Sequence, residues 1–162
     1  MKKILFIFIA AIGISSQVNA QDIADHAIGV RFGDSSGFGA EVNYQLGLSE
    51  KNRLEFGLGL RDGSRNEAIK AIGLYHWVWN IDGGLNWYAG PGAGIEFINF
   101  DDDYYDNRDS KAYAIIAGDV GLEYNFDFPL LISIDFRPEI GFEDYDDDDI
   151  RFNVGLSARY QF

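Results

Sequence analysis

The chain has 162 residues and carries 26 acidic against 13 basic side chains, a formal net charge of −13 at pH 7. Binding to nucleic acid requires Lys and Arg opposite the phosphates, so this balance argues against a nucleic-acid partner. The chain contains no cysteine, which excludes disulfides and a cysteine-linked lipid anchor.

The start of the chain has the layout of a secretory signal peptide. Two lysines precede an almost unbroken apolar run from Leu5 to Ile14, and Val18 and Ala20 occupy positions −3 and −1 of a cleavage site. The run is too short to cross a bilayer as a helix, which takes about 20 residues. We therefore expect residues 1–20 to be removed and residues 21–162 to form one domain, with a retained anchor as the alternative.

Apolar and polar residues alternate along eight segments of the mature chain, as in β-strands with one dry and one wet face. The alternation is strictest in residues 150–162, where every even position is apolar and every odd position is polar or glycine. In residues 68–80 both faces carry apolar side chains, so the pattern assigns neither face to the interior. The predicted strands span residues 28–33, 38–46, 53–61, 68–80, 85–100, 112–126, 130–142 and 150–162.

The connections between these strands alternate in character. Residues 49–52, 82–84 and 127–129 are tight turns of turn-forming residues. The connections on the opposite side include two longer polar loops, and they span residues 34–37, 62–66, 101–111 and 143–149. Tight periplasmic turns, longer outer loops and an even strand count are typical of bacterial outer-membrane barrels. The expected fold is an all-β, eight-stranded antiparallel up-and-down transmembrane β-barrel.

The same alternation would fit a soluble barrel or sandwich with its apolar face inside. Two features favour lipid outside. Large apolar residues on nearly every strand would crowd the interior of an eight-stranded barrel, which is just wide enough for side chains. Aromatic residues, which favour the membrane interface, flank one tight turn; they are Tyr75, Trp77, Trp79, Trp87 and Tyr88.

The polar face carries charges of both signs in mid-strand, which a closed lumen can hold only as paired, hydrogen-bonded groups. We therefore predict a plugged polar lumen. The alternative is an ordinary solvated face, as in a soluble periplasmic barrel that carries a ligand inside. The predicted lumen charge network consists of Arg31, Glu41, Glu55, Arg61, Glu96, Asp119, Glu123, Asp135, Arg137, Glu139, Arg151 and Arg159.

Two segments carry a family resemblance. The terminal residues 158–162 resemble the C-terminal signature of outer-membrane barrels, and residues 85–94 are similar to a recurring strand of the small eight-stranded outer-membrane β-barrel domain proteins of Gram-negative bacteria. The resemblance covers the whole mature chain in pattern. It implies that Tyr160 and Phe162 are read by the barrel assembly machinery. It also implies a monomer in the outer membrane, in contact with lipid and lipopolysaccharide.

Candidate catalytic groups are few. Ser35 and Ser36 superficially resemble a serine-hydrolase loop, but a hairpin turn explains them better than a catalytic triad does. The glycine-rich residues 90–94 lack the Lys and Ser or Thr of a phosphate loop. His76 is the remaining candidate, because lipid-modifying barrels of the resembled group use a His and a Ser. We favour a structural histidine and predict no catalytic residue and no cofactor.

Two dense acidic loops could bind divalent cations, because Ca²⁺ takes several carboxylate oxygens. Neither loop has the spacing of an EF-hand, and a solvated outer loop is the better interpretation. The weak metal candidates are Asp101, Asp103, Asp106, Asp146 and Asp148.

The sequence thus predicts a non-enzymatic outer-membrane barrel with a plugged lumen and acidic extracellular loops, in a structural or surface-contact role. The alternatives are a small-solute channel and a lipid-modifying barrel enzyme.

Overall fold

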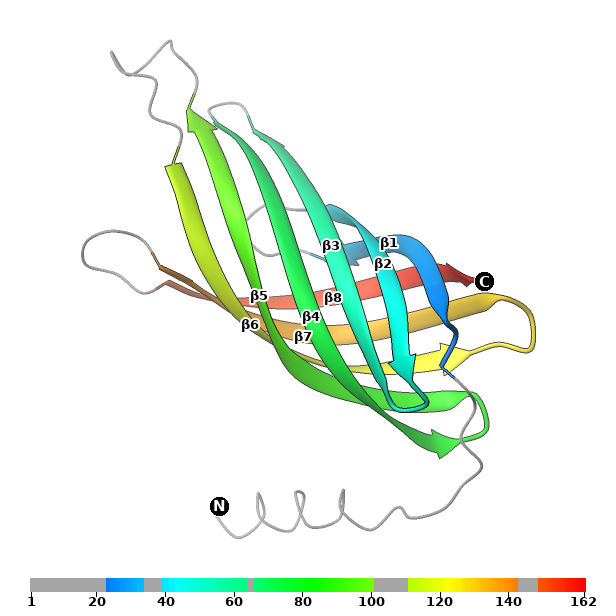
Figure 1. Ribbon diagram of the computed structural model, residues 1–162. Helices are drawn as coiled ribbons and strands as arrows, with labels where there is room; N and C mark the ends of the chain where they lie inside the picture. Colours follow the sequence, from blue (N-terminus) through cyan, green and yellow to red (C-terminus); the bar gives the residue numbers. More distant parts are fainter. Residues whose placement is uncertain (1–22, 34–38, 64–65, 101–110, 143–148) are drawn as a thin grey trace, which may run out of the picture.

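The computed structural model describes residues 23–33, 39–63, 66–100, 111–142 and 149–162. Eight strands, each antiparallel to its neighbours, form one closed barrel, as predicted (Figure 1). No helix in these ranges is long and apolar enough to cross a bilayer. The strands are β1 (His26–Gly33), β2 (Ala40–Ser49), β3 (Asn52–Gly63), β4 (Asn66–Asp82), β5 (Leu85–Phe100), β6 (Lys111–Asn125), β7 (Leu130–Phe142) and β8 (Asp149–Gln161).

The sheet closes with a large stagger. Following hydrogen-bonded partners once around the barrel from Ile140 leads back to β7 at Leu130, ten residues lower in number. This stagger requires the strands to tilt against the barrel axis, and the tilt is plain in Figure 1. Residues that meet in the interior are therefore far apart in the sequence.

The three tight turns, the start of β1 and the end of β8 all lie at one end of the molecule, which we name the turn end (Figure 1). Gly83, between β4 and β5, has a φ of 50°, a left-handed conformation that glycine adopts most readily. The amide of Phe126 donates to the carbonyl of Leu130 at 3.1 Å and closes the β6–β7 turn. The amide of Phe162 donates to the carbonyl of His26 at 2.9 Å, which ties the last residue to the start of β1.

The outer wall of the barrel is apolar and the interior is charged. Phe152 is 64% exposed on β8, whereas Arg159 of the same strand is 1% exposed. All eight strands expose large apolar side chains in this way; examples are Phe32, Val42, Leu58, Ile69, Ile95, Ile116, Ile134 and Leu156. Such a wall is the opposite of that of a soluble barrel, whose apolar side chains fill the core.

The burial of its side chains shows which face of β4 points into the barrel, which the sequence pattern did not assign. Its even-numbered residues face inward, including the apolar Ile72, Leu74 and Val78 beside the polar Lys70 and His76. The inward apolar residues gave both faces of this segment the same character. The interior is consequently polar on one side and partly apolar beside β4.

Glycines of β5 make room for these inward side chains. A Cβ added to Gly92 would collide with the side chain of Leu74, and one added to Gly94 would lie 2.5 Å from the carbonyl oxygen of Ala71 and 3.2 Å from Cβ of Ile72. Glycine in a strand often marks such a close approach. The run of glycines in residues 90–94 therefore has a packing role.

The polarity of the wall gives a first testable prediction. Leu156 lies near the middle of β8 and is 55% exposed. We expect Leu156→Arg to lower the free energy of unfolding in phospholipid vesicles by about 2–4 kcal/mol, the cost of an arginine at the bilayer midplane. Denaturant titration measures the change, with Leu156→Ile as the matched control. Equal stability of the two variants would contradict a lipid-facing wall.

Candidate functional site

The candidate site is the charged interior of the barrel. Of the predicted lumen network, Arg151 is 19% exposed in its side chain and the side chain of Arg61 falls outside the described residues. The other ten members face inward and are buried: Arg31, Glu41, Glu55, Glu96, Asp119, Glu123, Asp135, Arg137, Glu139 and Arg159.

Glu41 of β2 is shared by three cations. Its carboxylate lies 2.8 Å from Nζ of Lys70, 3.0 Å from Nη1 of Arg137 and 3.9 Å from Nη1 of Arg31. Lys70 also reaches Glu139 of β7 at 3.1 Å. One carboxylate thus joins strands β1, β4 and β7 to β2 through the centre of the barrel.

Glu55 of β3 forms a second shared acceptor. Its carboxylate accepts from Nη2 of Arg159 at 3.0 Å, from Nε2 of Gln45 at 2.7 Å and from Nη2 of Arg137 at 3.4 Å. Arg159 donates further to Oγ of Ser133 at 2.7 Å. Because each group has several partners, the desolvation of every charge is offset by more than one interaction.

Asp135 of β7 fixes the arginine of the first strand. Nε of Arg31 donates to both carboxylate oxygens of Asp135 at 3.0 Å, and Nη2 donates to one of them as well. Such fork-shaped pairs are stronger and more directional than neutral hydrogen bonds. Nη2 of Arg31 also donates to Oδ1 of Asn153 at 3.3 Å, so that β8 joins the group formed by Arg31 and Asp135.

A third cluster lies nearer the turn end and surrounds His76. Arg53 pairs with Glu123 at 2.7 and 3.0 Å and lies over the ring of Tyr88 at 4.8 Å. Nε of Arg53 donates to Nδ1 of His76 at 3.4 Å. This places the proton of a neutral imidazole on Nε2, which contacts Asp119 at 3.0 Å.

Arg53, Lys70 and His76 also belong to the charge network, although they were not among its predicted members. The alternation of its strand places Arg53 on the same polar face as Glu55, two residues later, but Arg53 was not predicted to join the network. Lys70 and His76 belong to β4, whose parity the apolar residues concealed.

Tyr88 does not belong to the predicted interface cluster, because it is 1% exposed and lies inside the barrel. The alternation along its segment predicts this inward face, which it shares with Asn86 and Glu96, and the structure confirms it. Trp77 and Trp79 do face outward, at 44% and 37% exposed.

Glycines in the wall allow the largest interior side chains to lie directly against the backbone. A Cβ on Gly155 would collide with the guanidinium of Arg31, and one on Gly121 would meet the ring of Tyr88. The flat groups therefore lie directly on glycine backbone, and this leaves space for their partners across the barrel.

Charge in the described interior is nearly balanced. Six cationic side chains (Arg31, Arg53, Lys70, Arg137, Arg151 and Arg159) face seven carboxylates (Glu41, Glu55, Glu96, Asp119, Glu123, Asp135 and Glu139). Near balance is what a solvent-poor interior requires, since an unpaired buried charge is costly.

His76, the remaining catalytic candidate, is part of the charged interior. His76 is fully buried, and both ring nitrogens have partners. Within the described ranges there is no group of three or more side chains that could hold a metal ion. Ser35, Ser36 and the weak metal candidates Asp101, Asp103, Asp106, Asp146 and Asp148 lie outside the described residues.

The two residues of the predicted assembly signal lie at the turn end. Tyr160 and Phe162 are 57% and 62% exposed. The ring of Phe162 stacks on His26 with centroids 5.5 Å apart. Both aromatic side chains thus remain on the outer surface next to the seam between β1 and β8.

No family model and no curated protein matches this chain. Among solved structures, the N-terminal β-barrel domain of OprF from Pseudomonas aeruginosa is similar, with a TM-score of 0.63 at 15% identity over 86% of this chain and 98% of that one. Neisserial surface protein A gives 0.62 at 10% identity, covering 85% and 94% of the two chains. Ail, the attachment invasion locus protein of Yersinia pestis, gives 0.52 at 16% identity, covering 85% and 96%. These likenesses confirm the predicted fold, a closed eight-stranded antiparallel β-barrel.

The second prediction concerns Glu55. Glu55→Ala leaves the guanidiniums of Arg159 and Arg137 without a shared acceptor. We expect the free energy of unfolding in vesicles to fall by about 3–5 kcal/mol, as when one partner of a buried ion pair is removed. Glu55→Gln, which keeps an acceptor oxygen, should lose less.

The control is Glu50→Ala in the exposed β2–β3 turn, which should change stability by no more than about 0.5 kcal/mol. If Glu55→Ala and Glu50→Ala were equally stable, the Glu55 cluster would make no net contribution to the fold.

Proposed function

We propose that this chain is exported through a signal peptide cleaved after Ala20 and spans the outer membrane of a Gram-negative bacterium as a monomeric, non-enzymatic barrel. Its lumen is closed by ion pairs, and its acidic loops face the outside of the cell. The observation that carries the proposal is the polarity of the barrel, with large apolar side chains outside and paired charges inside.

The outer wall supports a membrane location. Soluble monomers rarely expose contiguous apolar patches of more than a few hundred Å², whereas here large apolar side chains are exposed on all eight strands. A closed sheet also pairs its backbone groups without a free edge, which lipid requires. Trp77, Trp79 and Tyr160 are exposed near the turn end, where a headgroup region would lie.

The arrangement of the ion pairs supports a closed lumen. Arg53–Glu123 joins β3 to β6, Arg137–Glu41 joins β7 to β2, and Lys70–Glu139 joins β4 to β7. Arg151 and Glu96, at 2.9 Å, join β8 to β5 nearer the opposite end. Each pair links strands that are three positions apart around an eight-stranded barrel. The side chains therefore cross the interior rather than line its wall.

A structural or surface-contact role follows from these features. A barrel without an open bore serves as a membrane anchor for whatever its loops present. Aspartates and tyrosines are interleaved in residues 101–106 and 144–149, a composition suited to contacts with cationic or amine-bearing surface groups. Lipopolysaccharide would surround the outer half of the wall, and the barrel assembly machinery would read Tyr160 and Phe162.

Membrane fractionation with heat-modifiable gel mobility tests the location. We expect the unheated protein to be recovered with the outer membrane and to migrate differently before and after boiling, because a closed barrel resists detergent until heated. Recovery in the soluble periplasmic fraction would refute the proposal and favour a soluble ligand carrier.

Planar bilayer recordings test the closed lumen against the channel alternative. We expect no steady openings from the wild-type chain, because ion pairs cross the interior. We also expect that Arg137→Ala, which removes a group bonded to both Glu41 and Glu55, raises the frequency of brief openings. Steady wild-type openings would make the protein a small-solute channel.

The enzymatic alternative is tested by comparing lipid A from cells that express wild-type protein and His76→Ala. We expect identical lipid A, since the imidazole is buried and bonded on both nitrogens. A lipid modification lost with His76 would overturn the non-enzymatic assignment.

A further inference from the structure

Residues 23–25, which precede β1, stay in contact with the barrel at the turn end. The carbonyl of Asp25 accepts a hydrogen bond from the amide of Gly47 at 2.8 Å, which continues the β1–β2 pairing beyond His26 and Leu46. Ile23 and Ala24, just before this bond, are both half-buried. The chain is thus anchored at the rim of the barrel before it reaches the first strand.

Gly47 is the residue of β2 against which Ala24 and Asp25 lie. It has the same parity as the inward-facing Asn43 and Gln45, and the pairing of β2 with β3 shifts register immediately after it. A Cβ at Gly47 would lie only 2.9 Å from the carbonyl oxygen of Ala24. The missing side chain lets the backbone of Ala24 approach the lumen side of β2.

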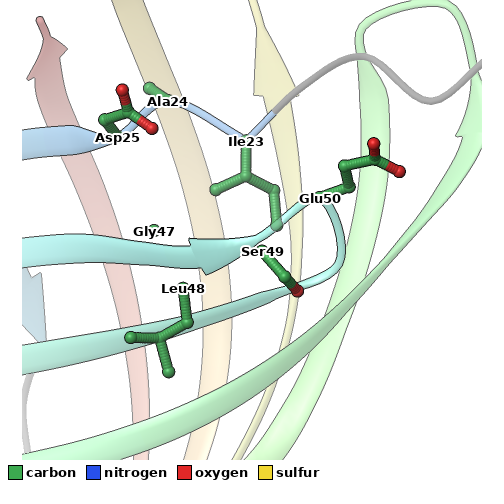
Figure 2. A pocket seen from close by; sticks show the side chains of 7 residues that line it. All are labelled: Ile23, Ala24, Asp25, Gly47, Leu48, Ser49 and Glu50. Atoms are coloured by element: carbon green, nitrogen blue, oxygen red, sulfur yellow. The ribbon is translucent and has the colours of Figure 1, made fainter.

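Ile23 and Ala24 separate two spaces of very different size. On one side they line an open groove of about 480 Å³ with Leu48, Ser49 and Glu50 (Figure 2). On the other side they line a cavity of about 10 Å³, which is at the lower limit of the space that one water molecule needs. The lumen side of that small cavity is formed by Gln45, Arg53, Asn86, Glu123, Asn125, Leu131 and Gln161.

Those lumen residues come from six strands: β2, β3, β5, β6, β7 and β8. Two residues that share a cavity with six of the eight strands lie across the mouth of the barrel and not beside it. Directly behind them is the Arg53–Glu123 pair, which is the ion pair closest to this mouth. An apolar cover over such a pair excludes water and strengthens its attraction.

We propose that Ile23 and Ala24 form a strap that closes the turn-end mouth of the lumen against water and small solutes. The strap rests on the proposed closed lumen, to which it adds a second barrier. It is made from residues next to the start of the mature chain and is held by the Asp25–Gly47 hydrogen bond. In Figure 2 the side chain of Ile23 points toward the β2–β3 turn and bounds the groove on that side.

Thiol labelling tests the strap, because the chain has no cysteine of its own. Asn125→Cys places a single thiol in the small cavity behind Ile23. In detergent micelles this thiol should react slowly with a charged methanethiosulfonate reagent. Adding Ile23→Gly, which removes the apolar side chain, should raise the labelling rate by about tenfold or more through easier local opening.

Gly47→Ala, which displaces Ala24, should raise the labelling rate in the same way. The matched control is Gly39→Ala, where an added Cβ meets nothing within 4 Å, and its rate should equal that of the parent. Heat-modifiable mobility identifies the folded fraction of each variant, and rates are compared on that fraction. Ile23→Ala provides a milder version if Gly47→Ala folds poorly.

A thiol that reacts equally fast in the folded parent, Ile23→Gly and Ile23→Ala would overturn the strap. A slow thiol in the parent that becomes fast in these variants supports it. The closed lumen is judged separately by bilayer conductance. Steady wild-type openings combined with strap-dependent labelling would refute the charge-closed lumen and leave the strap in place.

Discussion

The barrel is organised by the need to pair charges in a space too narrow for water to do so. An eight-stranded barrel has an interior that side chains just fill. Thirteen charged side chains face that interior in the described part of this chain. Taking an ion out of water costs several kcal/mol unless a partner and further hydrogen bonds compensate. Shared acceptors such as Glu41 and Glu55 meet this condition by serving several cations each.

The distribution of large and small residues follows from the same restriction. Where an arginine or tyrosine crosses the interior, a glycine forms the wall behind it, as Gly155 does for Arg31 and Gly121 for Tyr88. The side beside β4 is filled differently, by Ile72, Leu74 and the facing Ile115 of β6. The interior is therefore a packed core in which ionic and apolar regions lie side by side. The remaining large apolar side chains lie on the outer wall.

Period-two alternation was enough to locate all eight strands, with ends within three residues of those observed. It also assigned the inner and outer faces wherever one face of a strand is apolar and the other polar. It did not assign the faces of β4, because Leu74 and Val78 point inward there. The pairing of charges could not be predicted, because it depends on the ten-residue stagger of the closed sheet. Arg53 meets Glu123 across 70 residues of sequence, and no local pattern encodes that encounter. The position of Ile23 and Ala24 was equally hidden, since two residues have no period.

The seam between β1 and β8 carries more than backbone hydrogen bonds. Arg31 of β1 needs Asp135 of β7, and Arg159 of β8 needs Glu55 of β3, so charges on both seam strands find their acceptors elsewhere in the sheet. A sheet inserted into hydrocarbon before its two ends meet would present these guanidiniums without their full set of acceptors. Insertion and closure are thus coupled energetically. For a barrel in a membrane, a truncated chain that lacks the last strand would gain little from entering the bilayer, because Glu55 would lose Arg159 and β1 would lose the backbone partner at its open edge.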